Sequence, residues 1–222
     1  MAGRSGGGRS PKVTLDREIF VDAALRLASR PHTLSLTYRD LGKEVGVDPT
    51  AVYRHFRSKE SLMQELLDRI LLISHAKVST PVDQWEDCLT EFAAATLDTF
   101  LEFPAIAVTA TSLTTGGQGE LDCMELILDC FTQAGLHGQT LVKQYAVYGA
   151  YVLAGAAGQA RDQAEAPDAL SREWFTGPLL VDQERNPLVS SIRDQVLEID
   201  RREIFLAGVQ QIVHAAREKV PA

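Results

Sequence analysis

Residues 36–67, LTYRDLGKEVGVDPTAVYRHFRSKESLMQELL, constrain the fold more than any other part of this 222-residue chain. Thr37 and Asp40 have the spacing of a capping box, so a helix is expected to begin there. Gly46 follows the last apolar residue of that helix and supplies a stop. The segment therefore begins with a short helix that ends in a tight turn near Val45.

A second helix start follows at once, with Asp48 as N-cap and Pro49 at the first helical position. This helix is predicted to end near His55. One side of the helix pair is apolar and predicts a small core of Leu41, Val45, Val47, Val52 and Phe56. The other side carries Tyr38, Arg39, Thr50, Ala51, Tyr53, Arg54 and His55. A short helix with such a face suits a DNA groove, but an ordinary helical hairpin accounts for the helix signals equally well.

The order of these residues resembles the DNA-binding domain of the tetracycline-repressor (TetR) family of bacterial regulators. The resemblance covers about residues 15–70, and its specific part is GVDPTAVYRHFRSKESL with its Tyr-x-His-Phe-x-x-Lys run. It implies that Thr37 and Tyr38 touch phosphate and that Arg39 reaches a base edge or phosphate. It also implies that Thr50 and Ala51 sit at the groove floor and that Tyr53, His55 and Lys59 hold the DNA backbone. Together with Arg54 from the outward face, the predicted DNA-binding set is Thr37, Tyr38, Arg39, Thr50, Ala51, Tyr53, Arg54, His55 and Lys59.

Charge is distributed unevenly along the chain. The formal net charge is −8, yet residues 1–77 hold thirteen Lys and Arg against nine Asp and Glu. That part therefore carries +4 and the remainder −12. Such asymmetry indicates a basic end that meets a polyanion and an acidic body that stays away from it.

The first ten residues, MAGRSGGGRS, contain no apolar run of the kind that a signal peptide requires. They predict a disordered basic arm, with contact to a minor groove as the alternative. The three cysteines show no CxxC spacing, which fits reduced thiols in the cytoplasm. The most apolar stretch, residues 145–158, is too short to span a bilayer.

Apolar residues recur at helical spacing through the rest of the chain, and no strand-like alternation is found. Helices are predicted at about 16–29, 58–76, 80–103, 104–113, 120–134, 145–158, 188–199 and 201–218. The start near residue 80 is expected from Thr80 and Asp83 as a cap. The run TTGGQGE at 114–120 is a loop, and without a preceding strand or a following GK[ST] it is not a phosphate-binding turn.

The predicted fold is all-α, with an N-terminal three-helix helix-turn-helix DNA-binding domain and a C-terminal helical ligand-binding and dimerisation domain. The expected boundaries are 1–13 for the disordered arm, 14–57 for the helix-turn-helix domain, 58–77 for a connecting helix and 78–222 for the body. The connecting helix starts beside the DNA and ends in the body, so it can carry a change of shape between them.

Two helices of the body are rich in small and apolar residues. They predict a self-complementary four-helix interface in a twofold homodimer, with Tyr151, Gly155, Phe205, Gly208 and Ile212 as interface residues. Packing within one chain is the alternative, and the resemblance favours the dimer. Substitution of Gly155 or Gly208 by arginine is expected to give a monomer.

The body is also expected to hold an apolar pocket with a few polar groups, which suits a small hydrophobic effector. In regulators of this resemblance the pocket lies among the middle helices. The predicted lining residues are Phe92, Phe100, Phe103, Thr109, Met124, Phe131, Tyr148 and Trp174, although plain core packing is an alternative for each of them.

No HExxH, GxSxG or His/Cys cluster with metal spacing occurs, so no metal, cofactor or catalytic residue is predicted. The sequence and the resemblance together predict a cytoplasmic, ligand-responsive regulator, expected to be a repressor that leaves an inverted-repeat operator when the effector binds. Its partners would be double-stranded DNA, a small hydrophobic effector and a second copy of the chain, with no membrane. A constitutive or protein-controlled DNA-binding module and, more remotely, an all-α enzyme are the alternatives.

Overall fold

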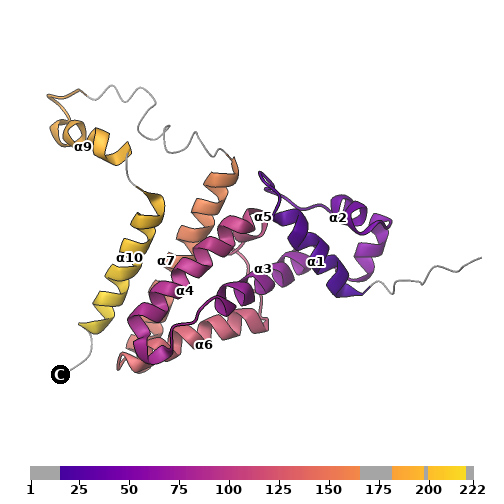
Figure 1. The fold of residues 1–222 in the computed structure, drawn as a ribbon, viewed down its shortest axis with the longest axis horizontal. Helices are drawn as coiled ribbons and strands as arrows, with labels where there is room; N and C mark the ends of the chain where they lie inside the picture. The colour runs from indigo at the N-terminus through magenta and orange to yellow at the C-terminus, as the bar shows by residue number, and fades with distance from the viewer. Residues whose placement is uncertain (1–15, 166–181, 198–199, 219–222) are drawn as a thin grey trace, which may run out of the picture.

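A computed structural model describes residues 16–165, 182–197 and 200–218, and every regular element in these ranges is helical. The molecule is elongated, with the N-terminal unit at one end and a larger bundle of helices at the other (Figure 1). The prediction of an all-α fold with an N-terminal helix-turn-helix and a helical body is confirmed. The basic arm and residues 166–181, which include Trp174, lie outside the described residues.

The N-terminal unit contains α1 (Arg17–Ala28), α2 (Tyr38–Val45) and the 3₁₀ helix η1 (Pro49–Arg54). Thr37 caps α2 by accepting the Asp40 amide at 3.1 Å, and Gly46 ends it in the left-handed conformation with φ 77°. The second helix was predicted without distinction of type. The structure shows a 3₁₀ helix of 6 residues, a type that occurs mainly in short segments.

Helix α3 (Lys59–Ala76) joins the two parts of the molecule. Ser58 and Ser61 form a capping box at its start, and its apolar side buries Leu62, Leu66 and Ile70. Two ion pairs fasten α3 to α1, one between Arg17 and Glu65 and one between Arg69 and Glu18. The N-terminal unit is therefore attached to α3 directly through α1.

The body consists of η2 (Val82–Gln84), α4 (Trp85–Glu102), α5 (Pro104–Ala107), α6 (Gln118–Gln133), α7 (Gly138–Glu165), α9 (Pro187–Leu197) and α10 (Arg201–Arg217). Helix α4 packs centrally against α3, α6, α7 and α10. The helix expected at 104–113 ends already at Ala107 and continues as turns, whereas α7 is longer than the apolar stretch that predicted it.

The predicted cap at Thr80 and Asp83 is wrong, because neither η2 nor α4 has a side-chain cap. Instead, Glu91 on α4 reaches back to the preceding loop. Its carboxylate accepts the amides of Ser79 at 3.1 Å and Thr80 at 2.7 Å. These hydrogen bonds, those from Thr80 first and those from Ser79 second, outweigh desolvation and lower the pKa of Glu91 to about 2.

We expect Glu91→Gln to lower the free energy of unfolding by about 1 kcal/mol at neutral pH, allowing for solvent screening of this accessible group. Because the folded-state pKa is depressed, the stabilisation is present above the ordinary value near 4.5 and is lost as pH falls toward 2. Denaturant unfolding between pH 2 and 7 measures this difference. Glu102→Gln at the C-terminal end of the same helix is the control, and an effect of Glu91→Gln that does not depend on pH would contradict the assignment.

Candidate nucleic-acid interface and ligand cavity

The helix-turn-helix holds η1 against α2 by a close backbone approach. A methyl group at Gly42 would lie 2.9 Å from the carbonyl oxygen of Val47 and 3.2 Å from Pro49, so glycine is required at this crossing. Asp48 caps η1 by accepting the Thr50 amide at 2.8 Å and the Thr50 hydroxyl at 2.6 Å. Val52, on the inner side of η1, is fully buried. These contacts fix which side of η1 faces outward.

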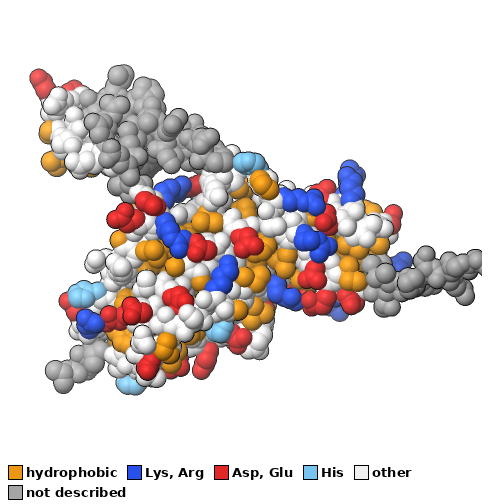
Figure 2. All heavy atoms as spheres, in the orientation of Figure 1, with side chains coloured by type: hydrophobic (Ala, Val, Ile, Leu, Met, Phe, Trp, Pro, Cys, Tyr) orange, Lys and Arg blue, Asp and Glu red, His pale blue; other side chains and the backbone are white. Residues whose placement is uncertain are grey.

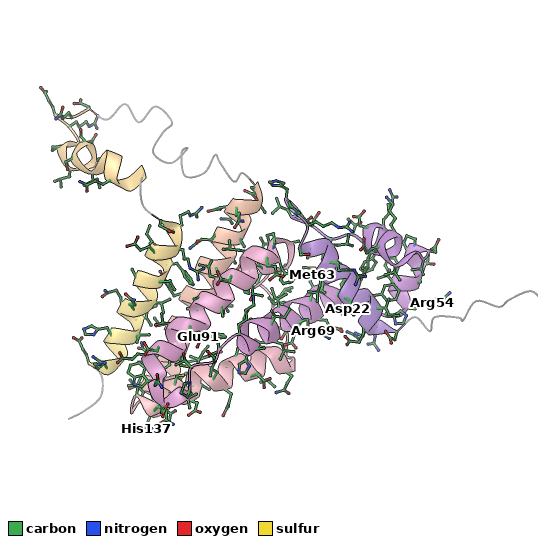
Figure 3. All side chains as sticks on the ribbon, in the orientation of Figure 1. Asp22, Arg54, Met63, Arg69, Glu91 and His137 are labelled. Atoms are coloured by element: carbon green, nitrogen blue, oxygen red, sulfur yellow. The ribbon has the colours of Figure 1, made fainter. Side chains whose placement is uncertain are left out.

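Most of the predicted DNA-binding residues lie on this outward side. Thr37, Arg39, Thr50, Tyr53, Arg54 and Lys59 are exposed, while Ala51 is partly exposed. Figure 3 places Arg54 at the outer end of the N-terminal unit, away from the body. His55 is more enclosed, since its ring packs 5.0 Å from that of Phe20 in α1.

Tyr38, which is predicted to touch phosphate, packs against a neighbouring tyrosine in this structure. Its ring packs edge-on against Tyr53 at 4.5 Å, and its hydroxyl is buried without a hydrogen-bond partner among the described residues. As placed, this hydroxyl is shielded from solvent, so contact with a phosphate would require the Tyr38 side chain or its surroundings to move.

Basic side chains divide into paired and unpaired groups. On the inner side, Arg26 and Arg30 both pair with Glu44, and the two arginines facing α3 and α1 are also paired. On the outward side no ion pair within the described part of the chain involves the following residues: Arg39, Lys43, Arg54, Arg57 and Lys59. Figure 2 shows basic side chains projecting from this end of the molecule. Lys43 and Arg57 were missed in the sequence, although their positions beside the motif could have indicated them.

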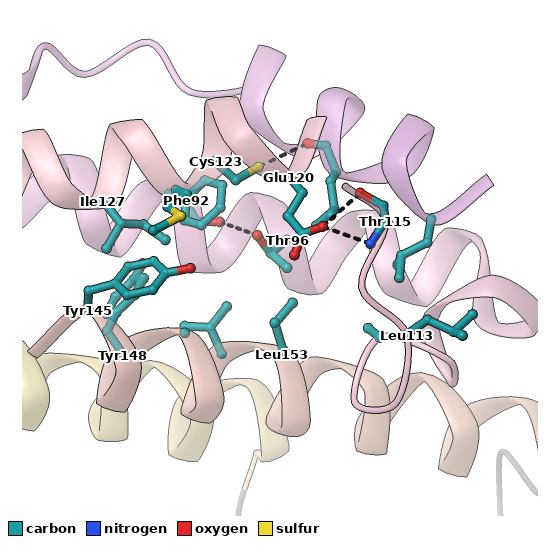
Figure 4. A pocket seen from close by; sticks show the side chains of 16 residues that line it. Phe92, Thr96, Leu113, Thr115, Glu120, Cys123, Ile127, Tyr145, Tyr148 and Leu153 are labelled. Atoms are coloured by element: carbon teal, nitrogen blue, oxygen red, sulfur yellow. Dashed lines mark hydrogen bonds between the residues drawn. The ribbon is translucent and has the colours of Figure 1, made fainter. Parts of the chain in front are cut away.

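A cavity opens in the body between α3, α4, α6 and α7 (Figure 4). The space open to the centre of a water molecule is about 80 Å³, well above the ~10–15 Å³ that one water needs. Its lining is mostly apolar, and the residues are Leu67, Leu71, Phe92, Thr96, Ala110, Leu113, Thr115, Glu120, Cys123, Met124, Ile127, Tyr145, Tyr148, Gly149, Val152 and Leu153.

Three of the predicted lining residues, Phe92, Met124 and Tyr148, line this cavity. Phe100, Phe103 and Phe131 are buried elsewhere in the core, and Thr109 lies outside the lining. The prediction favoured large aromatic residues, which fill space as often as they border it. Helical spacing was the better signal, because residues 120, 123, 124 and 127 of α6 face the cavity together.

The glycine-rich loop before α6 packs tightly on α3. Asp68 of α3 accepts the Thr115 hydroxyl at 2.7 Å, the Glu120 amide at 3.0 Å and the Gly119 amide at 3.1 Å. Methyl groups at Gly117 and Gly119 would overlap Asp68. These glycines therefore allow α3 to approach the start of α6, and the loop connects the cavity wall to the helix that leads to the helix-turn-helix.

Four of the five predicted interface residues of α7 and α10 contact one another within the chain, and the fifth, Ile212, contacts Gln144 of α7. The rings of Tyr151 and Phe205 stack at 5.7 Å, and the Tyr151 hydroxyl donates to the Phe205 carbonyl at 3.1 Å. A methyl group at Gly155 would lie 2.9 Å from the Phe205 ring, and one at Gly208 would overlap Tyr151. On α10, the Ile212 carbonyl accepts the Gln144 amide at 2.7 Å. Phe205 is 2% exposed and has no surface left for a partner.

A neighbouring face of the same two helices is free in the single chain. Val147 on α7 is 53% exposed and Ile204 on α10 is 51% exposed. Helical spacing places small exposed residues beside them, namely Ala150, Ala154 and Ala207. We call this the outward α7/α10 face. In the described part of the chain, no helix combines the length and apolar character needed to cross a bilayer.

Comparison with known proteins agrees with this geometry. Residues 20–66 match the family of bacterial regulatory proteins named tetR, and residues 79–215 match the tetracyclin repressor-like C-terminal domain. The HTH-type transcriptional repressor DrrR1 of Streptomyces coeruleorubidus is 28% identical over 168 residues, which is 76% of this chain and 61% of that protein. The tetracycline repressor protein class C of Escherichia coli is 38% identical over 69 residues, 31% of each chain. The matched part is thus less than two thirds of each of these relatives.

Solved structures share the fold across nearly the whole chain. The Streptomyces coelicolor regulator SCO7222, described as a TetR, aligns with a TM-score of 0.74 and 24% identity, covering 94% of this chain and 100% of that one. ActR from the same organism, solved in complex with actinorhodin, aligns with a TM-score of 0.78 and 19% identity. That alignment covers 95% of this chain and 100% of ActR.

Proposed function

Because the chain belongs to the tetR family of bacterial regulatory proteins and is a DNA-binding transcriptional regulator, we propose that it is a repressor controlled by a small hydrophobic effector. In this proposal a homodimer in the cytoplasm binds an inverted-repeat operator through its two helix-turn-helix units. Filling of the body cavity releases it from the DNA. The proposed division into arm, helix-turn-helix, connecting helix and body follows the boundaries given above.

One observation carries the proposal: α3 takes part in both sites. It begins at Lys59, within the unpaired basic surface, and contributes Leu67 and Leu71 to the cavity wall. A ligand in the cavity therefore contacts the helix whose other end positions the recognition element. The proposal that the protein represses transcription, rather than activating it, is supported by the name of DrrR1. The proposal of ligand control is supported by the complex of ActR with actinorhodin.

The unpaired basic residues support the DNA contacts. Arg39, Arg54 and Lys59 are free to pair with phosphate or to reach a base edge, because no acidic side chain of the described chain neutralises them. Thr50 and Ala51 at the start of η1 are small enough to allow close approach to the groove floor. Lys43 and Arg57 would add phosphate contacts at the margins.

Selection from random-sequence duplex DNA tests the function. We expect the purified protein to enrich an inverted repeat whose half-site centres lie about one helical turn, or a multiple of it, apart. Footprinting and sedimentation should give two chains, or a multiple of two, on each site. Enrichment of no motif would contradict the proposal, and enrichment of a single unrepeated half-site would remove its dimeric part.

Lys59→Ala should weaken binding to all duplex sequences alike and reduce the slope of log affinity against log salt by about one charge per protomer. The reason is that Lys59 is exposed and has no ion-pair partner in the described structure. Salt titration of the selected operator and of a scrambled duplex measures both effects. Lys77→Ala at the body end of α3 is the control, and a wild-type slope for Lys59→Ala would overturn its assignment to phosphate.

A further inference from the structure

Polar groups in the cavity wall differ in whether their hydrogen bonds are already made. The Tyr148 hydroxyl donates to the Leu89 carbonyl at 2.5 Å, the Cys123 thiol to Leu71 at 3.5 Å, and the Thr96 hydroxyl to Phe92 at 2.9 Å. Burial holds these donors neutral, raising the pKa of Cys123 to about 12 and that of Tyr148 well above its ordinary value. Because each of these groups already donates its hydrogen to a backbone carbonyl, none of them is available to donate to a ligand.

Glu120 and Tyr145 are different. One oxygen of Glu120, Oε2, accepts the amides of Thr115 and Gly116, each at 2.7 Å, and lies 2.9 Å from the Thr115 hydroxyl. The other oxygen, Oε1, has no hydrogen bond within the described chain, and neither has the Tyr145 hydroxyl. Figure 4 shows both side chains reaching into the same space, one from α6 and the other from α7.

Glu120 and Tyr145 offer a ligand complementary hydrogen-bonding groups, an acceptor and a donor. An ionised carboxylate only accepts hydrogen bonds, whereas a neutral tyrosine hydroxyl can also donate. Burial, and to a smaller extent the negative charge of Glu120, raise the pKa of Tyr145, so its phenolic hydroxyl keeps its proton at neutral pH. A ligand hydroxyl can donate to Glu120 and accept from Tyr145 at the same time. A ligand carboxylate placed there would face Glu120 with like charge and lose its hydration.

We propose that the effector is an apolar molecule carrying a hydroxyl group, which donates to Glu120 and accepts from Tyr145 while the rest of the molecule occupies the apolar wall. This inference rests on the proposed ligand-controlled function and specifies the chemical class of the ligand. The apolar part fits between Leu67, Ile127 and Val152, which come from three different helices. Glu120 is then the specificity-determining residue of the cavity.

The test compares three bicyclic probes of similar size: 2-naphthol, 2-methoxynaphthalene and 2-naphthoate. Each is titrated against full-length protein holding the fluorescent dye N-phenyl-1-naphthylamine, and thermal unfolding with each probe provides a second measurement that does not depend on the dye. We expect 2-naphthol to bind about tenfold more tightly than 2-methoxynaphthalene, the effect of one hydrogen bond to a charged acceptor. We expect 2-naphthoate to bind most weakly.

Glu120→Gln should reduce the preference for 2-naphthol over 2-methoxynaphthalene severalfold and lessen the rejection of 2-naphthoate. Glu125→Gln is the matched control, since Glu125 is exposed on the same helix and does not line the cavity. Equal binding of all three probes to the wild-type protein would overturn the hydroxyl inference and leave the ligand cavity intact. If neither the dye nor any probe binds or raises the unfolding temperature, the ligand-controlled function fails together with the inference.

Discussion

Replacing Val147 and Ile204 together by glutamate should convert the protein to a monomer and lower operator affinity by at least a hundredfold. Both side chains are about half exposed and lie on the outward α7/α10 face, where small neighbours permit close helix approach. Four carboxylates brought into a twofold interface would lose hydration without partners. A monomer also loses the effective concentration that a second half-site provides, which is typically worth a factor of 10²–10⁴.

Sedimentation equilibrium and operator titration measure these two effects. Leu121→Glu is the matched control, because Leu121 is 53% exposed but lies on α6. An unchanged dimer in the double variant would end the assignment of this face. The substitutions first expected to separate the dimer, Gly155→Arg and Gly208→Arg, should instead lower the unfolding temperature, because each glycine packs against the other helix of its own chain.

That revision shows what helical patterning can and cannot specify. Small residues at three- and four-residue spacing predicted that α7 would pack closely on another helix, and it does. The pattern does not state whether that helix belongs to the same chain. The stacking of Tyr151 on Phe205 shows that α7 packs on α10 of the same chain. This stacking depends on the relative rotation of two helices whose contacting residues lie more than 50 positions apart, which the pattern does not encode.

Local signals were reliable where the responsible contacts are local. Thr37 and Asp48 were predicted as caps, and each accepts an amide two or three residues further on. The expected cap at Thr80 failed because a distant group, the Glu91 carboxylate, takes the amides of that loop. A capping pattern identifies backbone amides that need an acceptor. It cannot show whether the local side chain or one distant in sequence will accept them.

The cavity was predictable in kind but only partly in its residues. Its apolar character follows from the composition of the middle helices, yet Glu120, Thr115 and Tyr145 were absent from the prediction. Glu120 read as a helix start after a glycine-rich loop. It takes its place in the wall because Asp68 occupies the helix N-terminus instead and leaves the Glu120 side chain to turn toward the loop and the cavity.

The contacts of Asp68 lead to the second prediction of large effect, which concerns coupling between cavity and DNA. Asp68 holds the loop and the start of α6 against α3, and Gln64 one turn earlier donates to the Thr114 carbonyl at 3.0 Å. Glu120 holds the same loop from the cavity side. A ligand that draws Glu120 inward therefore acts on α3, and the Arg17–Glu65 and Arg69–Glu18 pairs extend the connection to α1.

In the proposed mechanism the wild-type dimer shifts from mostly DNA-bound to mostly free, which requires a differential affinity on the order of 5 kcal/mol, or about 10⁴-fold. By linkage, operator DNA must weaken the ligand by the same factor. Asp68→Ala removes the acceptor that joins loop and helix, so we expect it to reduce both factors at least tenfold while operator binding without ligand persists. Asp68→Asn keeps one acceptor oxygen, so its coupling factors should lie between those of the wild type and those of Asp68→Ala.

The measurement is the affinity of a cavity ligand such as 2-naphthol with and without saturating operator, and the affinity of operator with and without that ligand. Asp98→Ala is the control, because its carboxylate joins α4 to α10 through Arg202 and lies away from the loop. Equal ligand affinity in both wild-type titrations would mean that the cavity does not control DNA binding. Undiminished coupling in Asp68→Ala would mean that the signal passes through the apolar contacts of Leu67 and Leu71, which are the residues of α3 that line the cavity.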